Sequence, residues 1–218
     1  MTILEAVEAR HMVRKYKDIS LSEAVIKNLK ERVEMNNSHY NLNIKLMVDN
    51  KKGVNGIAKH VLSKGVKNYF ILAGDEAPDL DERLGYCSAD LMLYAQTLGL
   101  NTWYVGGMFN RSVSQYVEGR KVIGVIAVGY GQTEGIPHKS KSAAEVSMYD
   151  GEIPEWFVSG IKTALLAPTA LNKQDFIISG KDNKVKIENE NGLFTGVNRG
   201  LVKYHFELGA GKNNFEWV

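Results

Sequence analysis

Two basic clusters, far apart in the sequence, hold the residues best suited to chemistry. The first lies near the N-terminus and comprises Arg10, His11, Arg14, Lys15 and Lys17. The second is a loop at residues 138–141 that contains Lys139 and Lys141. Arginine forks bind phosphate oxygens in pairs, and lysines act as point charges. The clusters are therefore candidates for binding a phosphorylated ligand. The alternative is a solvated basic face on a first helix and an exposed basic loop.

Other reactive patterns are absent from the sequence. The five histidines and the single cysteine, Cys87, show no metal-ligand spacing, so we expect no metal site. There is neither a G-x-x-x-x-G-K-[ST] phosphate loop nor a G-x-S-x-G nucleophile elbow. Cys87 has no nearby histidine or CxxC partner, and we interpret it as a core residue. The sequence therefore shows none of these patterns of metal or nucleophilic catalysis.

The composition narrows the class of protein. The chain has 218 residues, of which 44% are hydrophobic and 24% charged, as in an ordinary globular protein. A net charge of +2 creates no field that would gather nucleic acid or anionic lipid. One cysteine permits no intrachain disulfide, which fits a reducing cytoplasm. No stretch approaches the ~20 apolar residues of a membrane helix. We therefore expect a cytoplasmic protein with no nucleic-acid or membrane partner.

Apolar periodicity and turn residues predict a mixture of helices and strands. Residues 85–98 are apolar nearly all round, which is typical of a central buried helix. Residues 122–128 form an apolar run typical of a strand covered on both faces. Residues 132–152 are polar, and nothing there predicts a core. Further helices are expected at 2–12, after a capping box at 20–23, at 54–64, from 154 and at 200–208. Further strands are expected at 44–48, 69–73, 102–105, 176–179 and 185–187. The mixture predicts an α+β fold.

A weak internal repeat is also visible. Residues 25–48 resemble residues 156–178, with an offset of 131 where residues 37–43 lie over 168–174. Residues 85–95 resemble residues 200–210, with an offset of 115. The shorter second offset indicates a trimmed connection in the second half. The identities are few, so chance similarity between helix–loop–strand units is the alternative to a duplication.

Two separate segments resemble motifs of the FMN-dependent nitroreductase family. The opening segment is Arg10-His11-Met12-Val13-Arg14-Lys15-Tyr16, where the family has an arginine-rich pattern with a serine and a nearby aromatic residue. Residues 167–174 read Ala-Pro-Thr-Ala-Leu-Asn-Lys-Gln and are similar to the family's Ala-Pro-Ser-x-x-Asn-x-Gln. Residues 85–107 and 124–131 resemble the family's central helix, flavin-facing strand and closing core strand. The order and spacing match over most of residues 1–150. The resemblance implies an α-β-α sandwich with a mainly antiparallel central sheet flanked by helices.

The resemblance also implies roles for individual residues. Arg10, Arg14, Lys139 and Lys141 would bind the FMN phosphate, and His11 would lie at the O2 side of the flavin ring. Gly106 and Gly107 would let backbone N–H groups approach the flavin N5, with a tight turn as the alternative. Met12 stands where the family has serine, so one hydroxyl contact to the flavin is missing. The flavin edge and ribityl chain would be lined by Pro168, Thr169, Ala170 and Asn172. Independently of the resemblance, Asn198, Lys203 and His205 near the last helix are expected at the surface, with a substrate-side role as the alternative.

The motifs depart from the usual family order in one informative way. The Pro-Ser-x-x-Asn segment normally follows the first long helix, but residues 37–41 are a degraded version, Asn-Ser-His-Tyr-Asn. The better copy lies at 168–174. In the family, FMN lies at a two-fold interface, and each subunit contributes one motif. The chain can therefore be a fused pseudo-dimer, with residues 1–150 as a core half that binds the phosphate and residues 151–218 as a truncated half-repeat. An ordinary homodimer, with Ser38 and Asn41 contacting the flavin, is the competing hypothesis.

The resemblance implies that NAD(P)H reduces bound FMN and that a nitroaromatic, quinone or similar small acceptor is then reduced. FMN carries the chemistry, so no residue is assigned as catalytic. One alternative is a non-catalytic FMN- or nucleotide-binding protein of the same fold. Others are a flavin enzyme with a different reaction, such as reductive dehalogenation or flavin breakdown, and an α+β interaction domain without a cofactor.

Overall fold

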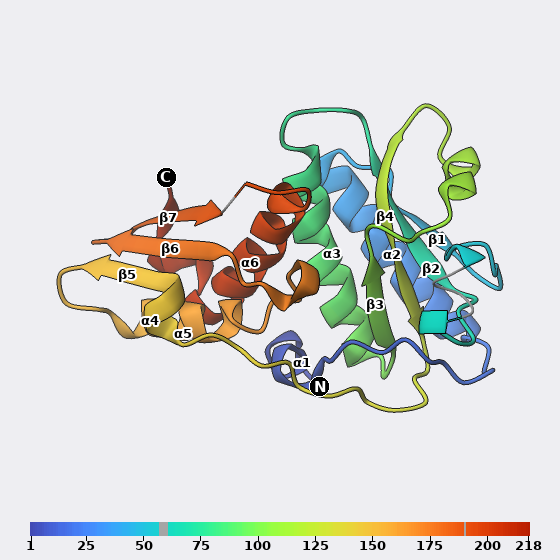
Figure 1. Cartoon of the computed structure of the whole chain (residues 1–218), viewed down its shortest axis with the longest axis horizontal. Helices are drawn as coiled ribbons and strands as arrows, with labels where there is room; N and C mark the ends of the chain where they lie inside the picture. Colours follow the sequence, from blue (N-terminus) through green and yellow to red (C-terminus); the bar gives the residue numbers. More distant parts are fainter. Residues whose placement is uncertain (57–60, 190) are drawn as a thin grey trace. The chain divides into compact units, whose positions relative to one another are not determined.

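The chain forms two compact units, shown together in Figure 1. The computed structural model describes residues 1–56, 61–189 and 191–218. Unit 1 comprises Met1–Leu80 and Leu91–Pro137, and unit 2 comprises Asp81–Asp90 and His138–Val218. The helix α3 contributes its first part to unit 2 and its last part to unit 1. Much of the helix expected at 54–64 lies outside the described residues. None of the described helices is both long and apolar enough to cross a membrane.

Unit 1 is built around a four-stranded antiparallel sheet. The strand order is β1-β2-β4-β3, and every neighbouring pair is antiparallel. The elements of unit 1 in chain order are α1 (Ile3–Ala9), α2 (Glu23–Tyr40), β1 (Lys45–Met47), β2 (Tyr69–Gly74), the end of α3 (Leu80–Thr97), β3 (Asn101–Val105), the 3-10 helix η2 (Arg111–Tyr116) and β4 (Lys121–Gly129).

The centre of this sheet is buried on both faces. All six residues of β2 and the last six of β4 are buried, as the apolar runs predict. One face carries a cluster that includes Tyr16, Trp103 and Val125, with cover from the segments around Val54 and Val113. The sheet is thus a rigid support for the segments that pack along its edge.

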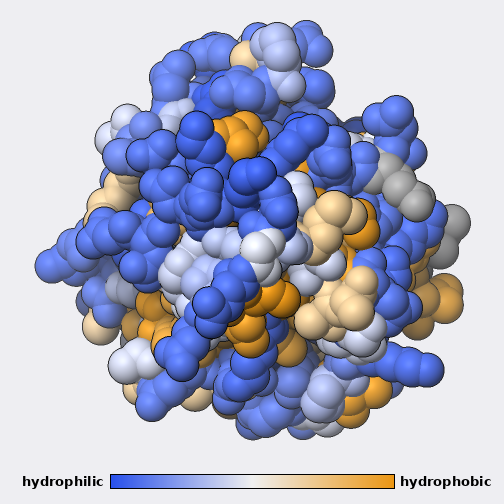
Figure 2. Space-filling model, turned by 90° about the vertical axis from the view of Figure 1, so that its left-hand side faces the viewer, coloured by the Kyte–Doolittle hydropathy of each residue, from blue (hydrophilic) through white to orange (hydrophobic). Residues whose placement is uncertain are grey.

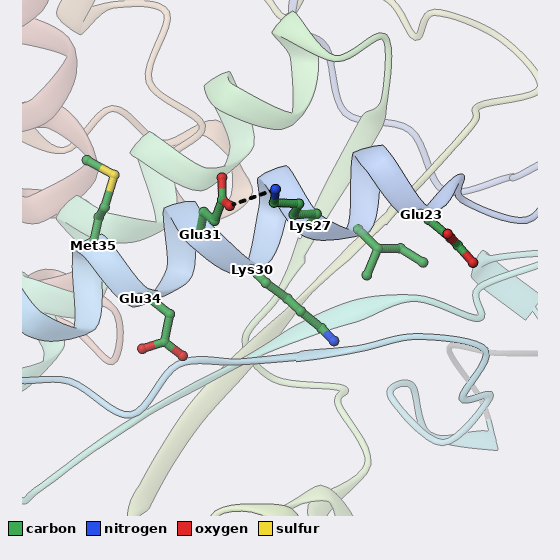
Figure 3. Close-up of a pocket in the computed structure, with 7 residues that line it drawn as sticks. Glu23, Lys27, Lys30, Glu31, Glu34 and Met35 are labelled. Atoms are coloured by element: carbon green, nitrogen blue, oxygen red, sulfur yellow. Dashed lines mark ion pairs between the residues drawn. The ribbon is translucent and has the colours of Figure 1, made fainter.

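Unit 2 contains a second four-stranded sheet, of mixed direction. Its order is β5-β6-β7-β8, with β6 and β7 antiparallel and the two outer pairs parallel. Its elements are the start of α3, α4 (Ala143–Val146), β5 (Ser147–Asp150), α5 (Glu155–Ala164), η3 (Ala170–Asn172), β6 (Phe176–Lys181), β7 (Lys184–Asn189), α6 (Thr195–Ala210), η4 (Lys212–Asn214) and β8 (Glu216–Trp217). Figure 2 looks onto the side of β5, β6 and β7 in Figure 1, where a mainly hydrophilic surface is interrupted by separate small apolar patches.

Helices α3 and α6 cross at very short range through two glycines in unit 2. A Cβ atom on Gly85 would lie 2.2 Å from the carbonyl oxygen of Val197. A Cβ atom on Gly200 would lie 2.0 Å from the carbonyl oxygen of Glu82. Since both obstacles are backbone atoms, neither can turn away as a side chain would. These positions require glycine because the two helix backbones touch there.

The two glycine contacts are related by the sequence repeat. Gly85 and Gly200 are 115 residues apart, and so are Glu82 and Val197, so the 115-residue offset converts one contact into the other. Reciprocal contacts of this kind are the signature of a two-fold interface. The order helix, antiparallel strand pair, helix also occurs twice, as α2-β1-β2-α3 and as α5-β6-β7-α6. β7 begins 115 residues after β2, and α6 begins 115 residues after α3.

Most predicted elements are present, and the α+β fold is confirmed. The expectation for residues 132–152 was wrong, because α4 and β5 lie there and Val146 is fully buried. β5 has only four residues, and alternate ones are exposed. Its strand conformation depends on parallel pairing with β6, which lies about thirty residues further along the chain.

Candidate functional site

The arginine-rich segment of unit 1 is extended rather than helical. Helix α1 ends at Ala9, and Arg10 is its C-cap residue with β backbone angles. Beyond it, Val13 N–H donates to Thr102 of β3 at 3.1 Å, and Tyr16 N–H donates to Lys64 at 2.8 Å. Lys17 N–H donates to Tyr130 at 2.8 Å. The segment is therefore held along the sheet edge by backbone hydrogen bonds on several sides, and the alternative of a basic helix face does not apply.

Tyr16 anchors this segment in the core. Its side chain is only 4% exposed, and its hydroxyl donates to the carbonyl of Val13 at 2.7 Å. Burial raises the pKa of Tyr16, so the phenol stays protonated as a donor. The ring packs against Gly129, where a Cβ atom would lie 3.2 Å from it. The aromatic residue of the motif therefore fixes the backbone that carries Arg10 and Arg14.

Arg10 is a buried cation whose Nε has no hydrogen-bond partner among the described residues. It is 5% exposed, and in the described part of the chain Nε has no hydrogen-bond acceptor. Desolvation lowers the pKa of Arg10 to about 10, so the guanidinium remains charged at neutral pH. Buried charges normally have paired anions, because an isolated one is strongly destabilising. The Nε of Arg10 is thus a buried, charged donor for which the described residues supply no acceptor, as a bound anion would.

The other unit 1 candidates lie on the same stretch of sheet edge. Arg14 is exposed, with its guanidinium 5.4 Å from the centre of the Trp103 ring. Met12 is 48% exposed, and Gly135 packs so closely on His11 that a Cβ atom there would lie 2.7 Å from the histidine Cβ. Met12 pairs with Thr102 of β3, whose last residue is followed directly by Gly106 and Gly107.

Gly107 leaves its backbone accessible. It is exposed, and a Cβ atom on it would have no neighbour within 4 Å. Gly106 is half-buried, next to Gly124 of the adjacent strand β4. Steric crowding therefore does not require glycine at 107, and the open backbone is compatible with close approach of a ligand. Met12, Arg14, Gly106 and Gly107 are thus connected through β3.

In unit 2 the structure brings the basic loop and the Pro-Thr-x-x-Asn segment together. Asn172 Nδ2 donates to the carbonyl of Lys139 at 2.7 Å. Lys141 is joined twice to Gln174, through its N–H to Oε1 at 2.7 Å and through its Nζ to the backbone carbonyl at 3.0 Å. Residues that are more than thirty positions apart in the sequence thus form one hydrogen-bonded group, which we name the loop cluster (residues 138–141 and 168–174).

The loop cluster has strained backbone. Leu171, Asn172 and Gln174 have φ values of 54°, 54° and 49°, in the left-handed region that favours glycine. Leu171 is also 90% exposed, so its side chain gains little from the conformation. Backbone strain of this kind persists where surrounding contacts over-determine it, and it is concentrated at functional sites.

Three polar residues of this region, Gln174, Asn198 and His205, were missed or misplaced in the sequence-based prediction. Gln174 is 1% exposed, and its Nε2 donates to the carbonyl of Leu165 at 2.7 Å. It belongs to the motif, which was the available signal. Asn198 and His205 were expected at the surface but are 4% and 1% exposed, because α6 is covered all round. Lys203 is half-buried, in an ion pair with Glu82 at 2.6 Å.

The candidate residues thus form two groups, one in each unit. Arg10, His11, Met12, Arg14, Gly106 and Gly107 belong to unit 1. Lys139, Lys141, Pro168, Thr169, Ala170 and Asn172 belong to unit 2. Thr169 is buried, and its Oγ1 accepts the N–H of Gln174 at 3.1 Å, so the hydroxyl stabilises the loop.

Comparison with solved structures identifies the fold. A protein described as a putative nitroreductase from Thermotoga maritima matches 98% of this chain and 85% of its own, with a TM-score of 0.66 and 20% identity. A nitroreductase-like protein from Streptococcus mutans covers 70% of this chain and 98% of its own, with a TM-score of 0.54 and 19% identity. A protein described as a putative nitroreductase, from Desulfovibrio desulfuricans in complex with FMN, covers 71% and 99%, with a TM-score of 0.56 and 14% identity. The fold is that of the nitroreductases.

The sequence places the chain more narrowly. The family model described as "Putative TM nitroreductase" matches residues 2–210. The chain therefore belongs to that family, and the predicted resemblance is confirmed. No curated protein matches the sequence.

Proposed function

We propose that this chain binds FMN and transfers electrons from NAD(P)H to a nitroaromatic, quinone or similar small acceptor. The observation that carries the proposal is Arg10, a buried guanidinium whose Nε finds no acceptor in residues 1–56, 61–189 and 191–218. The phosphate of FMN is an anion that suits such a group, because an arginine can bind two of its oxygens at once. Membership in a nitroreductase family and a neighbour in complex with FMN support this choice of anion.

Bound FMN supplies hydride transfer, and the protein supplies position and local charge. Arg10 and Arg14 would hold the phosphate, and Lys139 and Lys141 would add positive charge. The ammonium of Lys141 donates one hydrogen bond to Gln174 and retains two further N–H donors. His11 donates to the O2 side of the ring, where negative charge develops on reduction.

The flavin ring is positioned by the remaining candidates. Gly106 and Gly107 would let backbone N–H groups reach N5, and Met12 would lie at the flavin without the usual hydroxyl contact. Pro168, Thr169, Ala170 and Asn172 would line the other edge. The amide of Asn172 already donates to Lys139, so its Oδ1 is the atom left to accept from a ligand.

We further propose one flavin site per chain, in a monomeric pseudo-dimer. The Streptococcus mutans and Desulfovibrio desulfuricans proteins align over 98% and 99% of their own length but over only 70% and 71% of this chain. The remaining third is thus additional to one such subunit. The reciprocal contacts of Gly85 and Gly200 support a duplication. The site would then take its arginines from the first half and its Pro-Thr-x-x-Asn loop from the second.

The competing homodimer site uses Ser38 and Asn41, and two features disfavour it. Helix α2 continues through Tyr40, so Ser38 is helical where α5 has already ended before Pro168. Asn37 is used to close the following turn, with its amide donating to Ile44 O at 2.9 Å and accepting from Ile44 N at 2.8 Å.

The test is flavin binding followed by reduction. Purified chain should take up FMN, and should bind riboflavin, which lacks the phosphate, at least ten-fold more weakly. NADH or NADPH should then bleach the bound flavin without oxygen, and a quinone or nitroaromatic should restore the colour. Binding without bleaching would support the alternative, a non-catalytic FMN-binding protein. Failure to bind FMN would refute both.

A further inference from the structure

Asn198 is an unexpected residue for its place in the fold. It lies in the first turn of α6 and is 4% exposed. Asparagine is a poor helix former, and a buried amide must have hydrogen-bond partners. Neither helix stability nor apolar packing therefore explains an asparagine here, and its partners must.

Those partners lie at both ends of the strained loop. Oδ1 of Asn198 accepts the N–H of Ala170 at 2.9 Å. Nδ2 of Asn198 lies 3.5 Å from Oδ1 of Asp175. One rigid side chain on a helix thus connects the residue before the left-handed positions with the residue after them.

Other hydrogen bonds hold the later positions of the loop, including that from Asn172 to the carbonyl of Lys139. Gln174 is fixed through its side chain to Leu165 and through its N–H to Thr169. Ala170, which leads into the left-handed Leu171, is instead fixed through its N–H to Asn198. Without this acceptor the backbone at Ala170 and Leu171 would lose the contact that opposes the right-handed conformation preferred by non-glycine residues.

We propose that Asn198 is a positioning residue, which holds residues 169–172 in the geometry that the cofactor requires. This inference rests on the proposed FMN function, because it concerns the loop assigned to the flavin edge. Asn198 itself does not touch the cofactor. It acts through the N–H of Ala170, and its effect is to order the loop before FMN binds.

The chain permits a chemical swap that tests this role. Asn198→Ala removes the acceptor for Ala170. Asn198→Asp keeps an acceptor but places two carboxylates about 3.5 Å apart, since Asp175 lies at that distance. The double variant Asn198→Asp with Asp175→Asn keeps the acceptor and reverses the donor and acceptor of the second contact. Val202→Ala, at a fully buried α6 position, is the control for a general loss of stability.

Two readouts separate this proposal from the proposed function. The first is amide hydrogen exchange of residues 168–175 without FMN, which we expect Asn198→Ala to accelerate at least ten-fold and the swap to restore towards wild type. The second is FMN affinity, which we expect to fall about ten-fold in Asn198→Ala and to recover in the swap. Val202→Ala should leave both the amide exchange of residues 168–175 relative to the rest of the chain and the FMN affinity unchanged.

Unchanged loop exchange in Asn198→Ala, or no recovery in the swap, would overturn the positioning role even if wild type binds FMN. Faster loop exchange with unchanged FMN affinity would overturn it as well. If wild type binds no FMN, the proposed function fails, and the positioning role for the cofactor fails with it. The exchange comparison still decides whether Asn198 orders the loop.

Discussion

Replacing Gly200 with alanine tests the helix crossing at the centre of unit 2. The added Cβ would lie 2.0 Å from Glu82 O, 2.5 Å from Tyr86 N and 2.9 Å from Gly85 C. Ordinary carbon–oxygen contacts are about 3.3–3.6 Å, so the helices would have to separate by more than roughly 1 Å. All three atoms are backbone, so no side-chain rotation relieves the clash.

The magnitude follows from two opposing effects. Overpacking a core typically costs about 1–3 kcal/mol, and the upper end applies where backbone must move. Alanine improves helix propensity over glycine by about 1 kcal/mol. We therefore expect a net loss of about 2 kcal/mol, which lowers the melting temperature by about 4–8 °C for a chain of this size.

The assay is thermal unfolding followed by circular dichroism, with Gly192→Ala as the matched control. Gly192 lies outside the helices, and the nearest atom to its added Cβ would be Thr195 Oγ1 at 3.8 Å. Gly85→Ala should behave like Gly200→Ala, because the two contacts are reciprocal. An increase in melting temperature for Gly200→Ala would mean that helix propensity, and not overpacking, determines the effect of this substitution. The close crossing, and the two-fold relationship inferred from it, would then be refuted.

Further variants test Arg10 and the strained loop. Arg10→Met should raise the melting temperature of the cofactor-free chain, because it removes a buried charge. The same variant should weaken FMN binding ten-fold or more, because a charge-assisted hydrogen bond contributes about 1.5–3 kcal/mol. A loss of stability with unchanged FMN affinity would contradict both expectations. Desolvation lowers the pKa of Arg10 to about 10, well below the ordinary value that applies in the unfolded chain. Above pH 10 the residue Arg10 therefore binds more protons in the unfolded chain than in the folded chain. The stability of wild type relative to Arg10→Met, measured by urea titration, should rise with pH. A fall would refute the direction of this pKa shift. Leu171→Gly should raise the melting temperature by a few degrees, because it relieves a positive φ at an exposed position. Leu193→Gly, at another exposed position, should not raise it. Equal effects of the two variants would contradict the claim that the backbone at Leu171 is strained.

Local sequence patterns were sufficient to predict the helices and strands that are buried along their whole length. The apolar runs of β2 and β4, and the all-round apolar residues of α3, predicted the central elements because burial on every side leaves an unmistakable composition. The Arg10–Tyr16 motif predicted the basic segment but not its extended conformation. That conformation depends on hydrogen bonds to Thr102, Lys64 and Tyr130, which are distant in the sequence.

Signals that depend on distant partners were missed. β5 has no apolar run of its own and becomes a strand by pairing with β6. In the sequence, Asn198 cannot be distinguished from a surface asparagine. Its burial and its hydrogen bond to Ala170 are visible only in the folded structure. Gln174 carries a motif identity, but its burial and four hydrogen bonds to Thr169, Leu165 and Lys141 follow only from the folded loop cluster.

The most direct test of the central claim is the stoichiometry of FMN binding to chain of known mass in solution. Flavin fluorescence titration combined with light scattering should give one FMN per chain on a monomer. No binding, or one FMN per chain only in a homodimer, would contradict the account.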